Sequence, residues 1–340
     1  MDKDRTTSGE VDVSVIMPVR NEARHLRESL GAVLAQDIGP VRFEVLVVDG
    51  QSTDGTREIV QEFMRDHPSV RLLDNPGRIV PTAMNIGLSE ARGEVVVRVD
   101  GHCVVGSDYL RMAAETLRIT GCEGVGGKME AVGENFWGRA IAAATSCPFG
   151  VGNARFHYSD APGEADTVYL GAYRRDYLRQ IGGYDPAFVR NQDDELNYRI
   201  RTSGGLIFYT PRLRVRYRVR PSLSGLFRQY FEYGLWKIPM YRKTGHPLKA
   251  RHLAPAGFLA ALLGPILMAP WFPGALWITA VTLALHLLLG GLWAARSGGG
   301  HGWSLGIPVV FLTLHIAYGL GFLAGCFRPP IPSKGAEKPS

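Results

Sequence analysis

Cysteines are few in this sequence, and none of them are closely spaced. Only four occur in 340 residues, at Cys103, Cys122, Cys147 and Cys326, and no CxxC pair is present. Zinc sites and disulfide frameworks need cysteines at recurring spacings. We therefore exclude both and expect reduced thiols in a cytosolic domain. The N-terminal stretch MDKDRTTSGEVD is polar and charged, so we also expect no signal peptide.

Two common nucleotide-binding signatures are absent as well. The loop after the first apolar run reads MPVRNE where a dinucleotide-binding domain has GxGxxG, and neither GxxxxGKS nor GxxxxGKT occurs. The net charge is a modest +6, with Lys and Arg crowded between Arg199 and Arg251, just before a long apolar region. This arrangement favours a membrane surface or a phosphate-bearing ligand as partner, and no nucleic acid.

Charged residues almost disappear near the C-terminus. Between residues 253 and 327 the only full charge is Arg296. Three apolar blocks, 253–271, 275–295 and 305–327, each have about the 20 residues that cross a bilayer. We expect a membrane domain over 253–327, because a buried core of a soluble protein would be unusually apolar. Prolines interrupt the first block, which is either a bent span or a re-entrant hairpin.

Positive charges flank these blocks. Lys249 and Arg251 precede the first block, and Arg296 follows the second. Cytoplasmic loops are enriched in Lys and Arg, so the N-terminal domain and the Arg296 loop are expected in the cytoplasm. The side of the basic tail, 328–340, stays open. Three spans place it outside, whereas one re-entrant segment keeps it inside.

The first 220 residues alternate between strand and helix patterns. Short apolar runs typical of buried strands lie at 13–19, 43–50, 70–75 and 94–100, and segments with helical spacing lie between them. Such short connections predict right-handed parallel crossovers in an α/β domain. Ligands bind at the carboxyl ends of the strands in an open parallel sheet. Asp49 and Asp100 lie at such ends, so that edge is the expected site.

The two acids allow more than one interpretation when taken alone. Asp49 either caps the following turn or accepts a hydrogen bond from a base or a ribose. Asp100 and His102, two residues apart, either share a divalent cation or belong to a solvated turn. Mg²⁺ and Mn²⁺ favour carboxylate oxygen, and Mn²⁺ also accepts imidazole.

Six segments in a fixed order resemble a known family. They read VSVIMPVRNEARHLRESL, VLVVDGQSTDGT, AMNIGLSEARGEVVVRVDGH, VGGKM, GGYDPAF and NQDDELNYRIR. Over roughly residues 11–220 the chain resembles the inverting family 2 glycosyltransferases, which have the GT-A fold, a Rossmann-like nucleotide-diphospho-sugar transferase domain. The DGH triplet, the QYFEYGLWK segment and the apolar C-terminal part resemble glucosyltransferases of exopolysaccharide biosynthesis.

This resemblance implies roles for residues of the expected site. Pro18 and Glu22 belong to the loop that frames the nucleotide base, and Asp49 matches the acid that contacts the uracil or the ribose. Asp100 and His102 occupy the DxD motif, which binds the metal, Mn²⁺ or Mg²⁺, and the diphosphate of the sugar nucleotide. His102 replaces the second acid of that motif, so this site carries one negative charge less.

The resemblance also places the catalytic base. The ED pair of the family aligns with Gln192 and Asp193, which makes Asp193 the expected base and the adjacent Asp194 its rival. Alternatively, Asp193, Asp194 and Glu195 only place negative charge at the N-terminus of a helix, where anions are favoured.

Basic residues continue after this helix. Five arginines at alternate positions, 212 to 220, should share one face of a strand. The next segment, 222–252, is typical of an interfacial amphipathic helix. The QxxRW motif of processive polymer synthases is missing after Gln229, which favours addition of a single sugar. The expected domains are a tail (1–11), a GT-A domain (12–221), the interfacial segment, the membrane domain (253–327) and a polar tail (328–340).

Together these features predict a membrane-anchored, metal-dependent glycosyltransferase. We expect it to move a hexose, with UDP-glucose as the favoured donor, to a lipid-linked saccharide at the bacterial-type cytoplasmic (inner) membrane. One alternative is a polyprenyl-phosphate glycosyltransferase. An alternative of another class is a non-catalytic membrane scaffold with a degenerate sugar-nucleotide domain.

Overall fold

The computed structural model describes residues 11–245, 247–297 and 301–331. The predicted N-terminal tail lies almost wholly outside these residues, and so does most of the predicted C-terminal tail. The chain divides into two compact units. The first comprises residues 1–129 and 159–217, and the second comprises residues 130–158 and 218–340.

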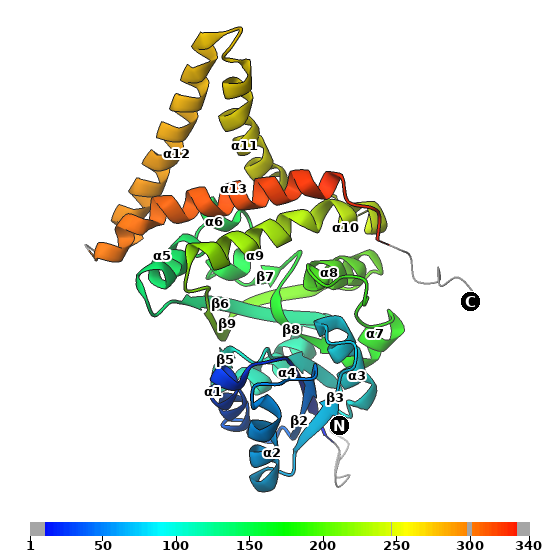
Figure 1. Ribbon diagram of the computed structural model, residues 1–340. Helices are drawn as coiled ribbons and strands as arrows, with labels where there is room; N and C mark the ends of the chain where they lie inside the picture. The colour runs from blue at the N-terminus through cyan, green and yellow to red at the C-terminus, as the bar shows by residue number, and fades with distance from the viewer. Residues whose placement is uncertain (1–10, 246, 298–300, 332–340) are drawn as a thin grey trace. The chain divides into compact units, whose positions relative to one another are not determined.

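The first half of the first unit is a parallel α/β layer (Figure 1). Its elements are β1 (Val13–Val19), α1 (Ala23–Leu34), β2 (Phe43–Asp49), α2 (Thr56–Asp66), β3 (Val70–Asp74), α3 (Val80–Glu90) and β4 (Val95–Arg98). The strands lie in the order β3-β2-β1-β4, and all three pairs are parallel. The predicted alternation is therefore confirmed. Every residue of β1 is buried, as expected for a strand covered on both faces.

The second half of this unit turns the sheet antiparallel. Its elements are β5 (Cys103–Val105), α4 (Tyr109–Thr120), β6 (Gly124–Val132), β7 (Gly163–Glu164), β8 (Tyr169–Arg174), α7 (Arg175–Gln180), α8 (Gln192–Thr202) and β9 (Ile207–Arg218). The sheet continues from β4 through β8, β6 and β9 to β5. On β9, Arg212, Arg214 and Arg216 are exposed while Leu213 and Val215 are buried, as the alternation predicts. The result is the mixed α/β sheet of a GT-A domain.

The second unit is helical. Its helices are α5 (Phe136–Ala144), α6 (Pro148–Val151), α9 (Leu223–Leu235), α10 (Lys237–Thr244), α11 (Ala250–Met268), α12 (Leu276–Ser297) and α13 (Ile307–Cys326). Residues 130–158 lie inside the predicted GT-A domain, yet they cluster with this unit. The reason is that Ile141 and Ala144 of α5 share a buried core with Phe311 and Leu314 of α13.

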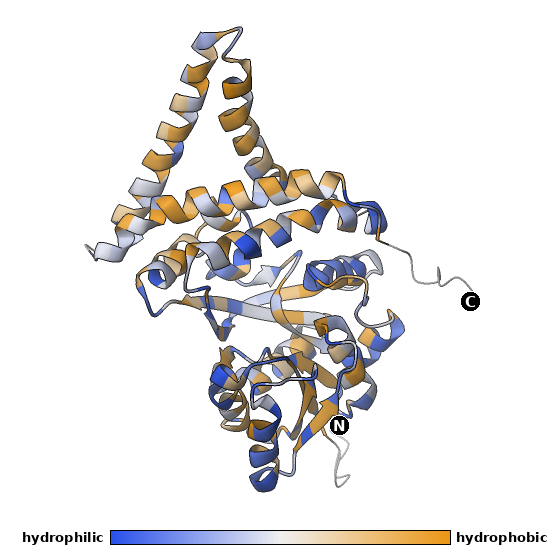
Figure 2. Cartoon of the chain, viewed as in Figure 1, coloured by the Kyte–Doolittle hydropathy of each residue, from blue (hydrophilic) through white to orange (hydrophobic). Residues whose placement is uncertain are grey.

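Three segments of this unit are long and apolar enough to cross a membrane. They are Ala250–Met268, Pro273–Ser297 and Gly302–Cys326. Helices α11 and α12 form a hairpin that is largely hydrophobic, as Figure 2 shows. Pro255 and Pro265 lie inside α11, which remains one helix despite them.

Helix α13 packs along α9, and glycines let the two backbones touch. A Cβ atom on Gly234 of α9 would lie 2.2 Å from the carbonyl oxygen of Tyr318. One on Gly321 of α13 would lie 2.0 Å from that of Phe231. Small residues at such crossings allow close helix packing. The predicted interfacial segment thus contains α9 and α10, and α9 is one half of a tightly packed helix pair.

Candidate active site

Two loops at the carboxyl edge of the parallel strands are fastened to each other. The backbone N–H of Asn21, after β1, donates to Oγ of Ser52 at 2.8 Å, and the Thr53 N–H donates to Oδ1 of Asn21 at 2.9 Å. Asn21 and Gln51 both have positive φ, 56° and 61°. Non-glycine residues rarely adopt this conformation, and they keep it where the surrounding contacts hold them in it. The expected site is therefore a preformed edge.

Asp49 is fully buried at the end of β2, and in the register of the sheet it pairs with Val19 of β1, the residue after Pro18. Its carboxylate accepts hydrogen bonds from the Ser52 hydroxyl at 2.5 Å and from Nη1 of Arg57 at 2.9 Å. Arg57 also bridges to Asp74 at 2.7 Å. The Ser52 N–H also donates to Oδ1 and Oδ2 of Asp49, at 3.3 and 3.2 Å, so Asp49 caps its turn.

Asp100 and His102 follow β4 at the same edge. Ligand atoms of Asp100, His102 and Cys103 all lie within 4.8 Å of one another. Burial raises the pKa of the Cys103 thiol, which also lies 3.0 Å from the Tyr169 hydroxyl. A thiol held in its protonated form is a poor ligand. The carboxylate and the imidazole are therefore the donors that suit Mn²⁺.

Glu22 lies beside this pair. Its Oε1 is 2.9 Å from Nδ1 of His102. When Nδ1–H donates to that carboxylate, the imidazole lone pair is on Nε2, which is the form that binds a cation. Glu22 was expected in the loop that frames the base, and the contact that the structure shows for its side chain is the one with His102. The Asp100 and His102 side chains thus fit a divalent cation, with Glu22 fixing the ring.

Asp193 lies in the first turn of α8. The residue that caps this helix, Asn191, has φ 59°, so the chain turns sharply just before the acid. Burial raises the pKa of Asp193, and the positive charge of Arg98 offsets part of that rise. Its side chain remains 29% exposed. A carboxylate with a raised pKa and some access to solvent is well suited to accept a proton.

Arg98 joins Asp193 to Asp100. Its Nε and Nη2 donate to Oδ1 and Oδ2 of Asp100 at 2.7 and 3.1 Å, and its Nη1 donates to Oδ1 of Asp193 at 2.5 Å. In the sequence, Arg98 interrupts the otherwise apolar run 95–99. The interruption itself was the signal, because a buried guanidinium needs acidic partners.

The other two acids of α8 differ from Asp193. Glu195 is buried and forms a bidentate ion pair with Arg199, at 2.7 and 2.8 Å. Arg199 also donates to the carbonyl of Gly183 at 2.7 Å. Through Arg199, Glu195 therefore holds the turn at residues 182–184, which reads GGY. Asp194, the rival base, lies on the same helical turn and is partly exposed. Of the three acids, Asp193 is the one bonded to Arg98.

Known proteins share this arrangement of sequence and fold. The model of the glycosyl transferase family 2 matches residues 14–182. The succinoglycan biosynthesis protein ExoA of Rhizobium meliloti (strain 1021) is 32% identical over 320 residues, covering 91% of this chain and 93% of that protein. A dolichyl N-acetyl-alpha-D-glucosaminyl phosphate 3-beta-D-2,3-diacetamido-2,3-dideoxy-beta-D-glucuronosyltransferase of Methanococcus voltae is 28% identical, covering 75% and 81%.

A solved structure supports the same assignment of fold. The mannosyltransferase PcManGT from Pyrobaculum calidifontis, in complex with GDP-Man and Mn²⁺, superposes with a TM-score of 0.60 at 22% identity. The match covers 94% of this chain and 88% of that one. Sequence and fold agree from the first strand to the C-terminal helices, and the chain is a glycosyltransferase that belongs to glycosyl transferase family 2.

Proposed function

We propose that this enzyme transfers a hexose from UDP-glucose to a lipid-linked saccharide at the cytoplasmic face of a bacterial-type inner membrane, during exopolysaccharide assembly. The observation that carries the proposal is the bridge of Arg98 between Asp100 and Asp193. The acid suited to the donor and the acid suited to the acceptor are therefore bonded to the same guanidinium. The similarity to ExoA, a protein of succinoglycan biosynthesis, supports the pathway. The Methanococcus voltae relative, named for a dolichyl-linked sugar, supports a lipid-linked acceptor.

The mechanism follows from the side chains. Asp100 and His102 would hold a divalent cation, Mn²⁺ or Mg²⁺, whose chemistry there is to offset the charge that develops on the leaving diphosphate. Pro18, Glu22 and Asp49 belong to the edge proposed for the nucleotide, where Glu22 is partly exposed and Pro18 and Asp49 are buried. Asp193 accepts the proton of the attacking hydroxyl, which is too weakly acidic to ionise by itself. A single displacement inverts the anomeric centre, so an α-linked donor gives a β-linked product.

We propose further that the α11–α12 hairpin inserts into the membrane and that the α9–α13 pair lies at its surface. Only 11% of the apolar stretch of Pro273–Ser297 is buried by protein, against 44% for Gly302–Cys326. Helix α9 carries Arg228 and Glu232, and it cannot accompany α13 across the bilayer without burying them in lipid.

The C-terminal end of α13 supports the same topology. Arg242 of α10 donates hydrogen bonds to the carbonyls of Cys326 and Arg328, at 2.8 and 2.9 Å. This end of α13 is therefore held beside a charged helix. Lys249 and Arg296 then flank the hairpin on one side, which the positive-inside rule makes cytoplasmic.

Mass spectrometry of product lipids tests the proposed reaction. The detergent-solubilised full chain is incubated with a membrane lipid extract and UDP-glucose, UDP-galactose or GDP-mannose. We expect a saccharide-bearing lipid to gain one hexose from UDP-glucose, EDTA to stop the gain and Mn²⁺ to restore it. Gain from GDP-mannose alone would overturn the donor. Addition of the hexose to a bare polyprenyl phosphate would favour the polyprenyl-phosphate alternative over a lipid-linked saccharide. Full activity in EDTA would refute the proposed metal dependence.

A further inference from the structure

Arg98 is a buried cation at the carboxyl end of an apolar strand. It ends β4, opposite Ile16 of β1, and its side chain is 5% exposed. A buried guanidinium is costly unless hydrogen bonds and opposite charges compensate it. Burial opposes its charge, yet Asp100 and Asp193 hold the pKa of Arg98 well above the ordinary value. The residue is therefore permanently charged, and its partners define what it does.

The guanidinium treats its two partners differently. It grips Asp100 with two parallel N–H groups, a geometry that fixes the plane of a carboxylate. It meets Asp193 with a single N–H group on the remaining nitrogen. The two acids are 93 positions apart in the chain and come from different segments, the turn after β4 and the start of α8. One rigid fork sets the spacing between them.

We infer that Arg98 is a positioning residue that couples the two halves of the catalytic site. It holds the donor-side acid and the acceptor-side acid at one fixed separation and offsets one of their two negative charges. A divalent cation that binds Asp100 therefore competes with Arg98, and a change at Asp100 reaches Asp193 through the same guanidinium. This inference rests on the roles proposed above for Asp100 and Asp193.

A purely structural ion pair is the competing explanation, and it predicts different behaviour. If Arg98 only fastens α8 to β4, its loss loosens the site, so that cation binding and transfer weaken together. If Arg98 competes with the cation, its loss strengthens cation binding while transfer falls. The two properties then move in opposite directions.

Arg98→Met in the full chain separates these explanations. Methionine fills a similar volume without charge. Binding of Mn²⁺ alone is followed by electron paramagnetic resonance, and again with UDP present. We expect Mn²⁺ to bind on the order of tenfold more tightly, because a positive charge beside its ligand is gone. Transfer should fall by about a hundredfold or more. Equal or weaker Mn²⁺ binding by the folded variant would overturn the inference.

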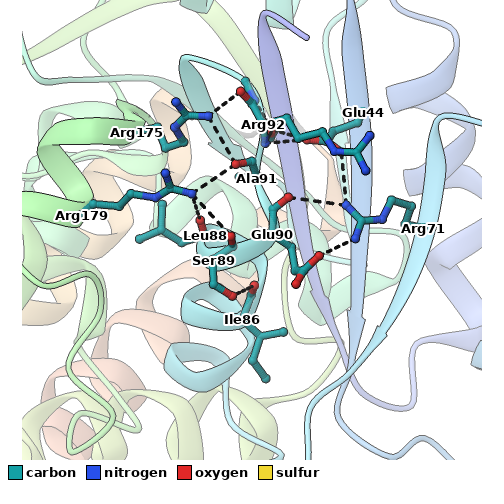
Figure 3. A network of polar contacts seen from close by, with 12 residues as sticks. Glu44, Arg71, Ile86, Leu88, Ser89, Glu90, Ala91, Arg92, Arg175 and Arg179 are labelled. Carbon is teal, nitrogen blue, oxygen red and sulfur yellow. Dashed lines mark hydrogen bonds and ion pairs between the residues drawn. The ribbon is translucent and has the colours of Figure 1, made fainter. Parts of the chain in front are cut away.

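The matched control is Arg71→Met. Arg71 also lies between two acids of the same unit, Glu44 at 3.6 Å and Glu90 at 2.5 Å, away from the carboxyl edge (Figure 3). Its loss should change thermal stability and leave Mn²⁺ affinity and transfer as they are. A similar effect of both variants on Mn²⁺ would mean that any lost arginine acts through net charge, which contradicts the inference.

A double variant tests whether Arg98 acts through Asp193. Residues that act as a unit are strongly non-additive. We expect Arg98→Met to slow the Asp193→Asn enzyme only a few-fold, and multiplied losses would overturn the coupling.

If Arg98→Met does not fold, Arg98→Lys keeps the charge without the fork. It should leave Mn²⁺ affinity near wild type and still slow transfer, whereas unaltered transfer would overturn the role of the fork. Failure of wild-type protein to bind Mn²⁺ would instead refute the proposed function.

Discussion

Glu22 and His102 are 80 positions apart in the chain, and their side chains meet at 2.9 Å. The contact orients the imidazole of the cation site. Loss of such a supporting carboxylate typically costs about 10–100-fold in metal affinity. We expect Glu22→Ala to weaken Mn²⁺ binding by that order and Glu22→Gln, which still accepts a hydrogen bond, to do so far less. Titration by electron paramagnetic resonance measures both.

Glu62→Ala is the control for this prediction. Glu62 forms an exposed ion pair with Arg27 at 2.5 Å, on the outer surface of α1 and α2. Removing it takes away one negative charge without touching the imidazole. Equal weakening by Glu62→Ala and Glu22→Ala would mean that net charge, and no orienting contact, sets the Mn²⁺ affinity.

Gly234→Ala tests the packing of α9 against α13. Alanine is the better helix former by about 1 kcal/mol, so the substitution should stabilise an isolated helix. Here its Cβ atom would lie 2.2 Å from the Tyr318 carbonyl oxygen, and we expect a lower Tm. Gly257→Ala on α11, where no heavy atom lies within 4 Å of the new Cβ, should be neutral or stabilising. Equal Tm values for the two variants would contradict the backbone contact.

The membrane topology is tested by labelling single introduced cysteines with an impermeant maleimide. With the α11–α12 hairpin inserted and α13 at the surface, Ser297→Cys and a cysteine added after Ser340 should both react from the cytoplasmic side. Labelling of the added cysteine from the outside would establish three spans and refute our topology. Gly274→Cys, at the hairpin tip, reports whether the hairpin crosses the bilayer, since it then reacts from the outside.

Activity should be lost on acidification earlier than an ordinary aspartate would predict. Burial raises the pKa of Asp193, and only the deprotonated carboxylate accepts a proton. As the pH falls through this raised pKa, the base is protonated and kcat/KM decreases. The acidic limb of the profile should move further up in Arg98→Met, because the cation that lowers the pKa is gone. An acidic limb at the ordinary pKa of aspartate would argue against Asp193 as the base.

Sequence patterns predict those parts of this protein that depend on neighbouring residues. The apolar runs indicate β1, β2 and β4, and the strand ends indicate the edge where Asp49 and Asp100 lie. The partners of Arg98 and of Glu22 depend on which distant segments the fold brings together. The hydrophobic periodicity of a short segment does not predict such contacts. The same reason explains why the sequence does not predict that residues 130–158 belong to the helical unit. Their buried core partners lie in α13, far away in the chain.

Asp193→Asn isolates the catalytic role of this acid from its structural one. Asparagine keeps the shape and can still accept a hydrogen bond from Arg98, but it cannot take a proton. Removing a positioned base costs about 10²–10⁴ in rate, so transfer should fall by that order while UDP binding stays the same.

The raised pKa of Asp193 means that the folded state holds the proton more tightly than the unfolded chain. The stability that the protonated form contributes is therefore lost as the pH rises through that pKa, and Asp193→Asn should remove this pH dependence from Tm. Asp194→Asn should slow transfer less. A collapse of activity in Asp194→Asn with Asp193→Asn near wild type would assign the base to Asp194. If neither variant slows transfer, the acceptor is already ionised, which is the behaviour of a polyprenyl phosphate.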